Sequence, residues 1–297
     1  MDLQGKTIVM TGAGNGIGRE VALEFARRGG RVVVSDRDGN AAQKVAGEIE
    51  LAGGTAMPLA CDVTKDEDMA RLKEAADTFG PADVLMNHVG AASSGPLTEI
   101  SLDDWRWVFE VNVVSIVRAL KLFLPEMMRR RTGLVINTSS SLALFPELPI
   151  ALPYIASKAG IVGLSEALAL QCRYVGVRIM ILAPDITETA FLSSERMVGI
   201  DPEEMAAAIP MSMKQPPKAV ADALFRAIDQ GRFLATNVPD YERLLRDRVT
   251  SLFEPDLRAY RQLEPVIAAA ARAAAQARDV LTNRSASEEE VLRQMYV

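Results

Sequence analysis

A chain of 297 residues, 49% of them hydrophobic, is long enough to bury a sizeable core. A net charge of −6, an isoelectric point near 5.1 and the lack of a dense run of Lys or Arg exclude nucleic acids and anionic membranes as expected partners. Two cysteines without CxxC spacing and one histidine offer no disulfide framework, metal site or histidine-based triad, so the sequence predicts a metal-free protein of the reducing cytoplasm.

The first predicted strand, residues 6–11, leads into a turn rich in glycine. Gly12, Gly16 and Gly18 follow Thr11 and precede a helix whose apolar residues recur at helical spacing. Glycines let the backbone approach a pyrophosphate closely, and the N-terminus of a helix favours an anion. The spacing differs from the common GxGxxG pattern, so the turn alone is weak evidence for a dinucleotide site.

The second predicted strand ends in Asp36, eighteen residues after Gly18. A dinucleotide-binding fold places at this point the acid that binds the adenosine ribose hydroxyls. The carboxylate would repel a 2′-phosphate and Asn15 supplies no positive charge for one, so NAD is favoured over NADP, although Arg37 weakens this preference. The alternative interpretation of Asp36 is a solvated turn residue.

Predicted strands and helices continue to alternate after this point. Thr64 and Glu67 form a candidate capping box for the third helix, and Ser101 with Asp104 caps a long helix that carries Asn112 among apolar residues. Further strands are expected at residues 57–60, 83–90, 134–139, 177–183 and 231–237. The alternation predicts an α/β fold over residues 1–238: a Rossmann-type, doubly wound, parallel seven-stranded sheet with helices on both faces.

Two segments stand apart from this alternation. Residues 185–216 are rich in methionine and weakly periodic, which suits a mobile lid or an adaptable apolar wall for a substrate, although ordinary packing is equally consistent. Residues 239–297 have apolar stripes and an alanine-rich run, which predict a C-terminal helical extension packed on the main domain or on a partner subunit.

Tyr154 and Lys158 lie four residues apart in a predicted helix that begins near Pro153. This spacing places the phenol and the ammonium on one helix face, where the ammonium stabilises the phenolate and lowers the pKa of the phenol. A phenol tuned in this way acts as a general acid and base near neutral pH. The same spacing arises by chance on many helices, so the pair depends on the motifs that precede it.

Four motifs in this order resemble those of the short-chain dehydrogenase/reductase family over residues 4–238: the glycine turn, Asp62-Val63, a strand that ends in hydroxyls, and Tyr154-x-x-x-Lys158. The resemblance implies a member of ordinary length with a C-terminal extension. It implies that Tyr154 exchanges the proton, that Lys158 lowers its pKa and binds the nicotinamide ribose, and that Asn112 anchors a proton-relay water. The cofactor contacts that it implies come from Gly12, Asn15, Gly16, Ile17, Gly18, Asp36, Arg37, Asp62, Val63, Asn87, Gly90, Tyr154, Lys158, Thr187 and Thr189.

Three positions depart from the family pattern. His88 replaces the second asparagine of Asn-Asn-Ala-Gly and is interpreted as structural. The serine that orients the substrate oxygen aligns with Ser140 when the strand is the anchor and with Ser141 when residues are counted back from the tyrosine; Ser140 is favoured. Asp185 replaces a glycine near the nicotinamide end, where its charge alters cofactor affinity or points to solvent.

The expected reaction is hydride transfer between NAD and a hydrophobic secondary alcohol or ketone, with Asn112, Ser140, Tyr154 and Lys158 as the catalytic set and no metal. The apolar character of the substrate is inferred from Leu142, Leu144, Phe145, Leu148, Phe191 and Leu192, which lie on segments expected to border it. Two alternatives remain: a catalytically silent dinucleotide-binding regulator, and an epimerase or dehydratase that uses the same residues.

Export, membrane insertion and oligomeric state are predicted from the N-terminal residues, from the apolar runs of the sequence and from the resemblance. The N-terminal residues show no basic region followed by an apolar run, and no stretch of about 18 apolar residues occurs, so neither export nor a membrane span is expected. The long helix around Asn112 and the helix after Tyr154 resemble the pairing surfaces of the family, which implies a homodimer or homotetramer.

Overall fold

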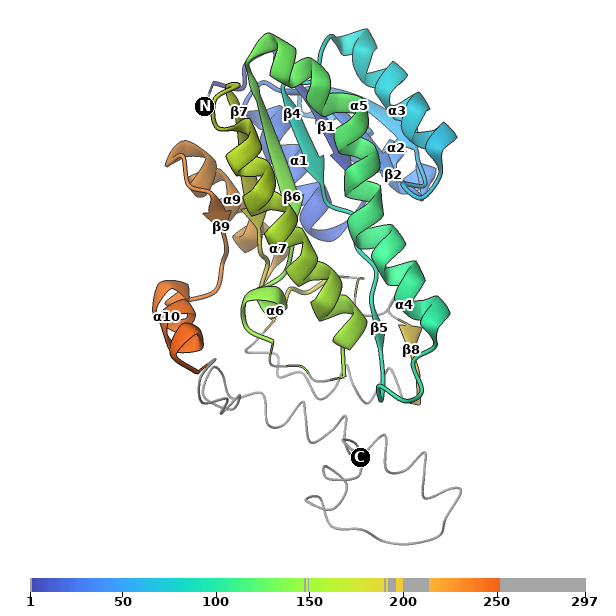
Figure 1. Ribbon diagram of the computed structural model, residues 1–297. Helices are drawn as coiled ribbons and strands as arrows, with labels where there is room; N and C mark the ends of the chain where they lie inside the picture. The colour runs from blue at the N-terminus through green and yellow to red at the C-terminus, as the bar shows by residue number, and fades with distance from the viewer. Residues whose placement is uncertain are drawn as a thin grey trace, which may run out of the picture.

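The fold is built on one parallel sheet of seven strands in the order β3-β2-β1-β4-β6-β7-β9, seen in the computed structural model, which describes residues 2–146, 148, 150–189, 191, 196–199 and 214–251 (Figure 1). The strands are β1 (Thr7–Thr11), β2 (Arg31–Asp36), β3 (Thr55–Ala60), β4 (Val84–Asn87), β6 (Gly133–Thr138), β7 (Val177–Leu182) and β9 (Leu234–Ala235). β1 pairs in parallel with both β2 and β4, so the strand order reverses there and a ligand crevice is expected at the carboxyl ends of these strands.

Helices cover both faces of this sheet, which confirms the predicted fold class. One face carries α1 (Gly16–Arg27), α2 (Gly39–Leu51) and α9 (Pro217–Asp229), and the other carries α3 (Asp66–Phe79), α5 (Ser115–Arg130) and α7 (Leu152–Cys172). Successive side chains of a strand point to opposite faces, so Ile8 and Met10 enter one core cluster and Val9 the other. The sheet is therefore buried on both sides, as its apolar strands require.

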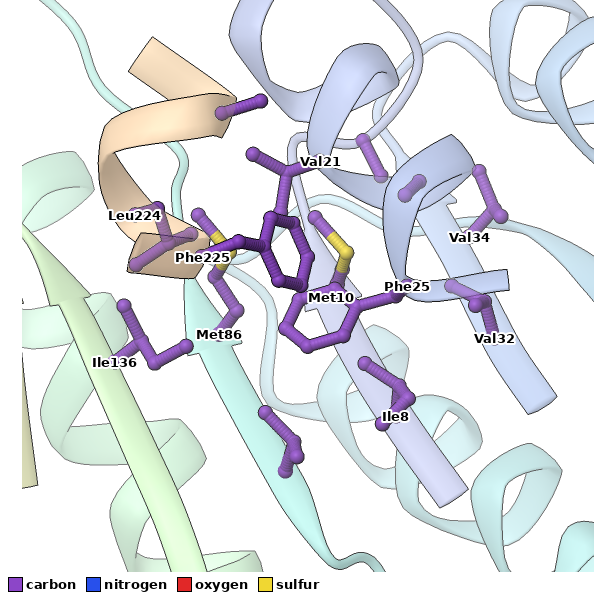
Figure 2. Close-up of a cluster of buried hydrophobic side chains, with 14 of the residues drawn as sticks. Ile8, Met10, Val21, Phe25, Val32, Val34, Met86, Ile136, Leu224 and Phe225 are labelled. Carbon is purple, nitrogen blue, oxygen red and sulfur yellow. The ribbon is translucent and has the colours of Figure 1, made fainter. Parts of the chain in front are cut away.

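The core between the sheet and its first helix is closed by an aromatic pair. Phe25 of α1 and Phe225 of α9 meet edge to face, with ring centroids 4.8 Å apart and planes at 71° (Figure 2). Both rings are buried, and each contributes roughly 1.5–3 kcal/mol by leaving water. The contact joins two helices nearly two hundred positions apart in the sequence and packs the last turn of α1 against α9.

The long helix predicted after residue 101 is interrupted. It consists of α4 (Leu102–Phe109), a π-helical turn η1 (Glu110–Val114) and α5. The predicted cap is confirmed, because the Ser101 hydroxyl accepts a hydrogen bond from the Asp104 backbone N–H at 3.0 Å. Asn112 lies within the π turn and is fully buried, which places the predicted buried amide at the one irregular point of the helix.

The predicted capping box at the third helix is wrong. α3 begins at Asp66 with Lys65 at its N-cap, and no side chain caps it there. Thr64 turns instead toward Asp62, because both its hydroxyl and its backbone N–H donate to Asp62 Oδ1, at 2.7 Å and 3.0 Å. An Asx turn at Asp62 therefore takes the threonine that a capping box would have used.

The C-terminal part of the described chain packs on a third apolar cluster. α10 (Tyr241–Ser251) contributes Leu244, which lies with Leu144 and Phe145 at the end of the short helix α6 (Ser141–Leu144). The strand predicted at 231–237 is reduced to the two residues of β9. Residues 252–297 and most of the segment 185–216 lie outside the described residues. Within the described part of the chain, no helix is both long and apolar enough to cross a membrane.

The packing at the start of α1 leads to a prediction about two glycines. A Cβ at Gly18 would lie 2.0 Å from the carbonyl oxygen of Gly12, whereas a Cβ at Gly47 of α2 would meet nothing within 4 Å. Gly18→Ala should therefore destabilise the fold by at least roughly 1–3 kcal/mol. Gly47→Ala should stabilise it by roughly 0.5–1 kcal/mol, because alanine loses less entropy in a helix. Thermal unfolding followed by circular dichroism measures both, and equal melting temperatures would contradict the packing described.

Candidate active site

Tyr154 and Lys158 lie on one face of α7, near its start, as predicted. Pro153 occupies the first turn of this helix, where its missing N–H costs nothing. The Lys158 ammonium lies 5.7 Å from the centre of the Tyr154 ring and donates a hydrogen bond to the Thr138 carbonyl at 2.9 Å. Lys158 is only 2% exposed, and this burial lowers its pKa from 10.5 to about 7. The pair therefore combines a phenol with an ammonium that the protein holds at a high desolvation cost.

A chain of two hydrogen bonds runs from η1 to the start of α7. Asn112 donates to the Ser157 hydroxyl at 2.8 Å, and Ser157 donates in turn to the Tyr154 carbonyl at 2.7 Å. Asn112 also exchanges two hydrogen bonds with the backbone of Ala91, at 2.7 Å and 2.9 Å. Its side chain therefore ties the loop after β4 to the helix that carries Tyr154. In the sequence, its place among apolar residues and the family resemblance were the signals that singled out Asn112.

Three consecutive serines at the end of β6 have three different partners. Ser139 donates to the Lys158 carbonyl at 2.8 Å. Ser140 is the N-cap of α6, and its hydroxyl oxygen accepts from the Leu142 N–H at 3.2 Å. Ser141 lies 3.2 Å from Asp185 Oδ1 and must donate, because an ionised carboxylate only accepts. Of these three serines, Ser140 is the one whose hydroxyl makes no donor bond to a described protein group.

The glycine turn lies at the other end of the same sheet edge. Gly12 and Gly16 have φ values of +68° and +51°, a left-handed conformation that glycine adopts without strain. The Gly14 N–H donates to Asp36 Oδ2 at 3.0 Å, so the turn and the end of β2 are joined directly. Asn15 precedes α1 and makes no side-chain cap bond, which leaves the first N–H groups of the helix directed at the turn. Such a helix end suits a phosphate.

A cleft of about 540 Å³ runs along the carboxyl edge of the sheet and joins these two ends. Fourteen predicted site residues line it: Gly12, Asn15, Gly16, Ile17, Asp36, Arg37, Asp62, Val63, Gly90, Ser140, Tyr154, Lys158, Thr187 and Thr189. Three others lie behind its wall. Gly18 packs on Gly12, Asn112 holds the loop after β4, and Asn87 donates to Asn137 Oδ1 at 2.8 Å. The structure therefore brings most of the predicted set to one cavity.

The loop after β4 forms the floor of the cleft beside Lys158. A Cβ at Gly90 would lie 3.3 Å from the Lys158 ammonium nitrogen, so a glycine gives the lysine its space. His88 donates its backbone N–H to Thr11 Oγ1, and its ring Nδ1 lies 3.1 Å from Thr138 Oγ1. Burial and then the charge of Lys158 lower the pKa of His88 to about 4, so the imidazole is neutral at pH 7. It packs as predicted for a structural residue and also borders the cleft.

Apolar side chains form part of the cleft wall next to Tyr154. Phe191 packs against the Tyr154 ring with centroids 5.6 Å apart, and Leu142 and Leu148 border the cavity as predicted. Leu144 and Phe145 do not, because both face the cluster under α10, so their predicted place at the substrate is wrong. Leu192 lies outside the described residues.

Sequence reasoning missed two further wall residues of this end, Trp107 and Val111. Their spacing of four along the helix that leads to Asn112 was the available signal. Within the described residues, no three His, Cys, Asp or Glu side chains come together as a metal site.

Comparison with known proteins agrees with this geometry. The family model described as short chain dehydrogenase matches residues 6–197. The 3beta-hydroxysteroid dehydrogenase 1 of Eggerthella lenta is 35% identical over 243 residues, covering 78% of this chain and 90% of that protein. A short chain dehydrogenase/reductase from Burkholderia phymatum in complex with NAD superposes with a TM-score of 0.74 at 26% identity, covering 85% of this chain and 96% of that one. A 7 alpha-hydroxysteroid dehydrogenase complexed with NADH and 7-oxo glycochenodeoxycholic acid gives a TM-score of 0.69 at 30% identity. The match covers 79% of this chain and 93% of that one.

The burial of Lys158 predicts how stability depends on pH. Its pKa is about 7 in the folded protein and 10.5 when exposed, so between these values the unfolded chain binds more protons. The free energy of unfolding should therefore rise from about pH 7 to about pH 10 by on the order of 3 kcal/mol. Lys158→Met should abolish this rise and should stabilise the protein most below about pH 7. Urea unfolding over this pH range measures it.

Lys218→Met is the matched control for this experiment, because Lys218 lies on the surface of α9 with its side chain 71% exposed. Its unfolding should follow the same pH dependence as the unaltered protein. A rise that persists in Lys158→Met would show that another group causes it.

Proposed function

The chain belongs to the short-chain dehydrogenase/reductase family, and from that premise we propose that it catalyses reversible hydride transfer between NAD and a hydrophobic secondary alcohol or ketone. One observation carries the proposal: a single cleft joins the glycine turn and Asp36 at one end to Tyr154, Lys158 and Ser140 at the other. The first end suits a dinucleotide, and the second suits proton exchange with an alcohol.

Tyr154 is the proposed general acid and base. In the oxidation of an alcohol, its phenolate takes the hydroxyl proton, while the Ser140 hydroxyl donates a hydrogen bond to the same substrate oxygen. Ser140 suits this role better than Ser141, because its proton is not directed at a protein carboxylate. The nicotinamide, when bound, supplies the acceptor for the hydride.

Lys158 supports this chemistry through its charge. Burial alone favours the neutral amine, but a phenolate formed close to it favours the ammonium. Each charged form therefore stabilises the other, and the two groups titrate as a pair. The hydrogen bond to the Thr138 carbonyl holds the ammonium in place for this interaction. By resemblance, the same ammonium binds the nicotinamide ribose.

The cofactor is proposed to be NAD rather than NADP. Asp36 lies at the end of the cleft that the glycine turn forms, and its carboxylate already accepts from Gly14. A 2′-phosphate placed there would meet a fixed negative charge in a partly buried site. Arg37 also borders the cleft and would offset part of this repulsion. Asp62 and Val63 line the wall where an adenine ring would lie.

The substrate is proposed to be a hydrophobic secondary alcohol or ketone, because Phe191, Trp107 and Leu142 surround the cleft near Tyr154. Relatives named for hydroxysteroids support an alicyclic substrate of some size. A homodimer or homotetramer is proposed from the resemblance, and the exposed apolar residues Val117 of α5 and Leu170 of α7 support it.

Removing the phenol hydroxyl tests the proposed acid and base. Tyr154→Phe should lower kcat for a hydroxysteroid by at least the ~10²–10⁴-fold that is typical of a general acid or base, while the Kd for NADH changes little. Tyr174→Phe is the matched control, since Tyr174 is 76% exposed and lies outside the cleft lining. NADH formation by absorbance and NADH binding by calorimetry measure the two quantities. Near-normal turnover in Tyr154→Phe would remove this residue from the mechanism.

Neutralising Asp36 tests the cofactor preference. Asp36→Asn keeps an oxygen that can accept from the Gly14 N–H and removes only the charge. The ratio of kcat/KM for NADP to that for NAD should rise roughly tenfold or more, because the repulsion of a 2′-phosphate is relieved. Asp77→Asn, which neutralises a surface carboxylate paired with Lys73 on α3, should leave the ratio unchanged. An unaltered ratio in Asp36→Asn would mean that the carboxylate does not face the ribose.

A further inference from the structure

The end of the cleft beside Tyr154 contains a carboxylate whose position is fixed. Asp185 follows β7 and borders the cleft together with Ser140 and Ser141. Its backbone N–H donates to Asn237 Oδ1 at 2.9 Å, and the Asn237 amide donates to Gln215 Oε1 at 3.0 Å. The backbone of Ser141 is held to the same loop, because its N–H donates to the carbonyl of the preceding Pro184 at 2.8 Å. The carboxylate therefore has a defined place in the wall.

The two serines present opposite polarity to this end of the cleft. Ser140 accepts from the Leu142 N–H, so its hydroxyl proton is available to a substrate oxygen. Ser141 gives its proton to Asp185 Oδ1, so its oxygen can offer a substrate only lone pairs. The carboxylate itself is an acceptor with about four lone-pair sites, so it can accept from a substrate group in addition to its protein partners. A donor site and an acceptor site thus lie one residue apart in the chain.

From this arrangement, and resting on the proposed function, we infer that Ser141 and Asp185 form an acceptor subsite that recognises a hydroxyl or ammonium group on the carbon next to the one oxidised. Ser140 would bind the reacting oxygen, and Ser141 with Asp185 would bind the donor group on the neighbouring carbon. An apolar body would fill the rest of the cleft. The preferred substrates would be hydrophobic 1,2-diols, amino alcohols and their ketones.

The negative charge of Asp185 sets the order of preference among substituents on the neighbouring carbon. A hydrogen bond to a charged group contributes more than one between neutral groups, and a cationic donor adds direct attraction. A carboxylate on the same neighbouring carbon would meet Asp185 as a like charge and would be rejected. Among the described residues that line this end, Lys158 is the opposite charge, and its ammonium donates to the Thr138 carbonyl.

Four benzylic alcohols that differ in one substituent test the inference: 1-phenylethanol, 1-phenyl-1,2-ethanediol, 2-amino-1-phenylethanol and mandelate. With NAD, kcat/KM for the diol should exceed that for 1-phenylethanol by roughly 10- to 100-fold. The amino alcohol should equal or exceed the diol, and mandelate should be the poorest. Each ratio is taken within one protein, so loss of active enzyme in a variant cancels.

Two variants separate hydrogen bonding from charge. Asp185→Gly installs the usual residue of the family. In this variant, the ratio of kcat/KM for the diol to that for 1-phenylethanol should be close to one. Asp185→Asn retains an acceptor but no charge, so it should reduce the advantage of the amino alcohol over the diol and relieve the rejection of mandelate. Asp222→Asn, which removes a surface carboxylate on α9, should leave all ratios as they were.

The outcomes distinguish the inference from the proposed function. Equal kcat/KM for the diol and 1-phenylethanol, or an unchanged preference in Asp185→Gly, would overturn the subsite while hydride transfer stands. Oxidation of a hydroxysteroid but of none of the four alcohols would overturn it as well. If neither the four alcohols nor hydroxysteroids were oxidised with NAD or NADP, the proposed function itself would fail.

Discussion

The burial of one ammonium group governs the arrangement of the whole site. Lys158 lies among protein atoms, where a charge is costly, and its hydrogen bond to the Thr138 carbonyl offsets only part of that cost. Gly90 must lack a side chain to leave the lysine its space, and Ser139 fixes the backbone from which it extends. In the proposed mechanism, the phenolate of Tyr154 is what makes the charged state of Lys158 favourable. On that proposal, the lysine is placed for chemistry at the expense of stability.

Most of the fold follows from periodicity, and its exceptions follow from side-chain contacts. Short apolar runs between amphipathic helices were enough to predict a parallel sheet covered on both faces, because buried strands leave few other solutions. Thr64 contradicted its local pattern, since the carboxylate of Asp62 competes for the hydroxyl that a helix cap needs. The π turn at Asn112 was equally hidden. It arises where a buried amide bonds to Ala91 and Ser157, groups that only the tertiary structure brings near.

The same division holds for the site. Residues that a short motif places at the end of a strand, such as Gly12, Asp36 and Ser140, all reach the cleft, because the carboxyl ends of parallel strands share one edge. Residues whose place depends on packing between distant elements were harder to predict. Phe145 reads as a neighbour of the substrate in the sequence, but α10 supplies an apolar surface that draws it into the core. Trp107 shows the converse, since the sequence did not place it at the site and it lies in the cavity wall.

Three identical residues in a row illustrate why a motif does not by itself assign a role. Ser139 donates its hydroxyl proton to a carbonyl of α7, Ser140 accepts from an N–H of α6, and Ser141 donates to a carboxylate after β7. A hydroxyl can donate or accept, so its chemistry is decided by the groups that surround it. Alignment alone left two serines as candidates. The direction of the proton supports Ser140 in the proposed mechanism, because a serine that already donates to a carboxylate cannot also donate to a substrate oxygen.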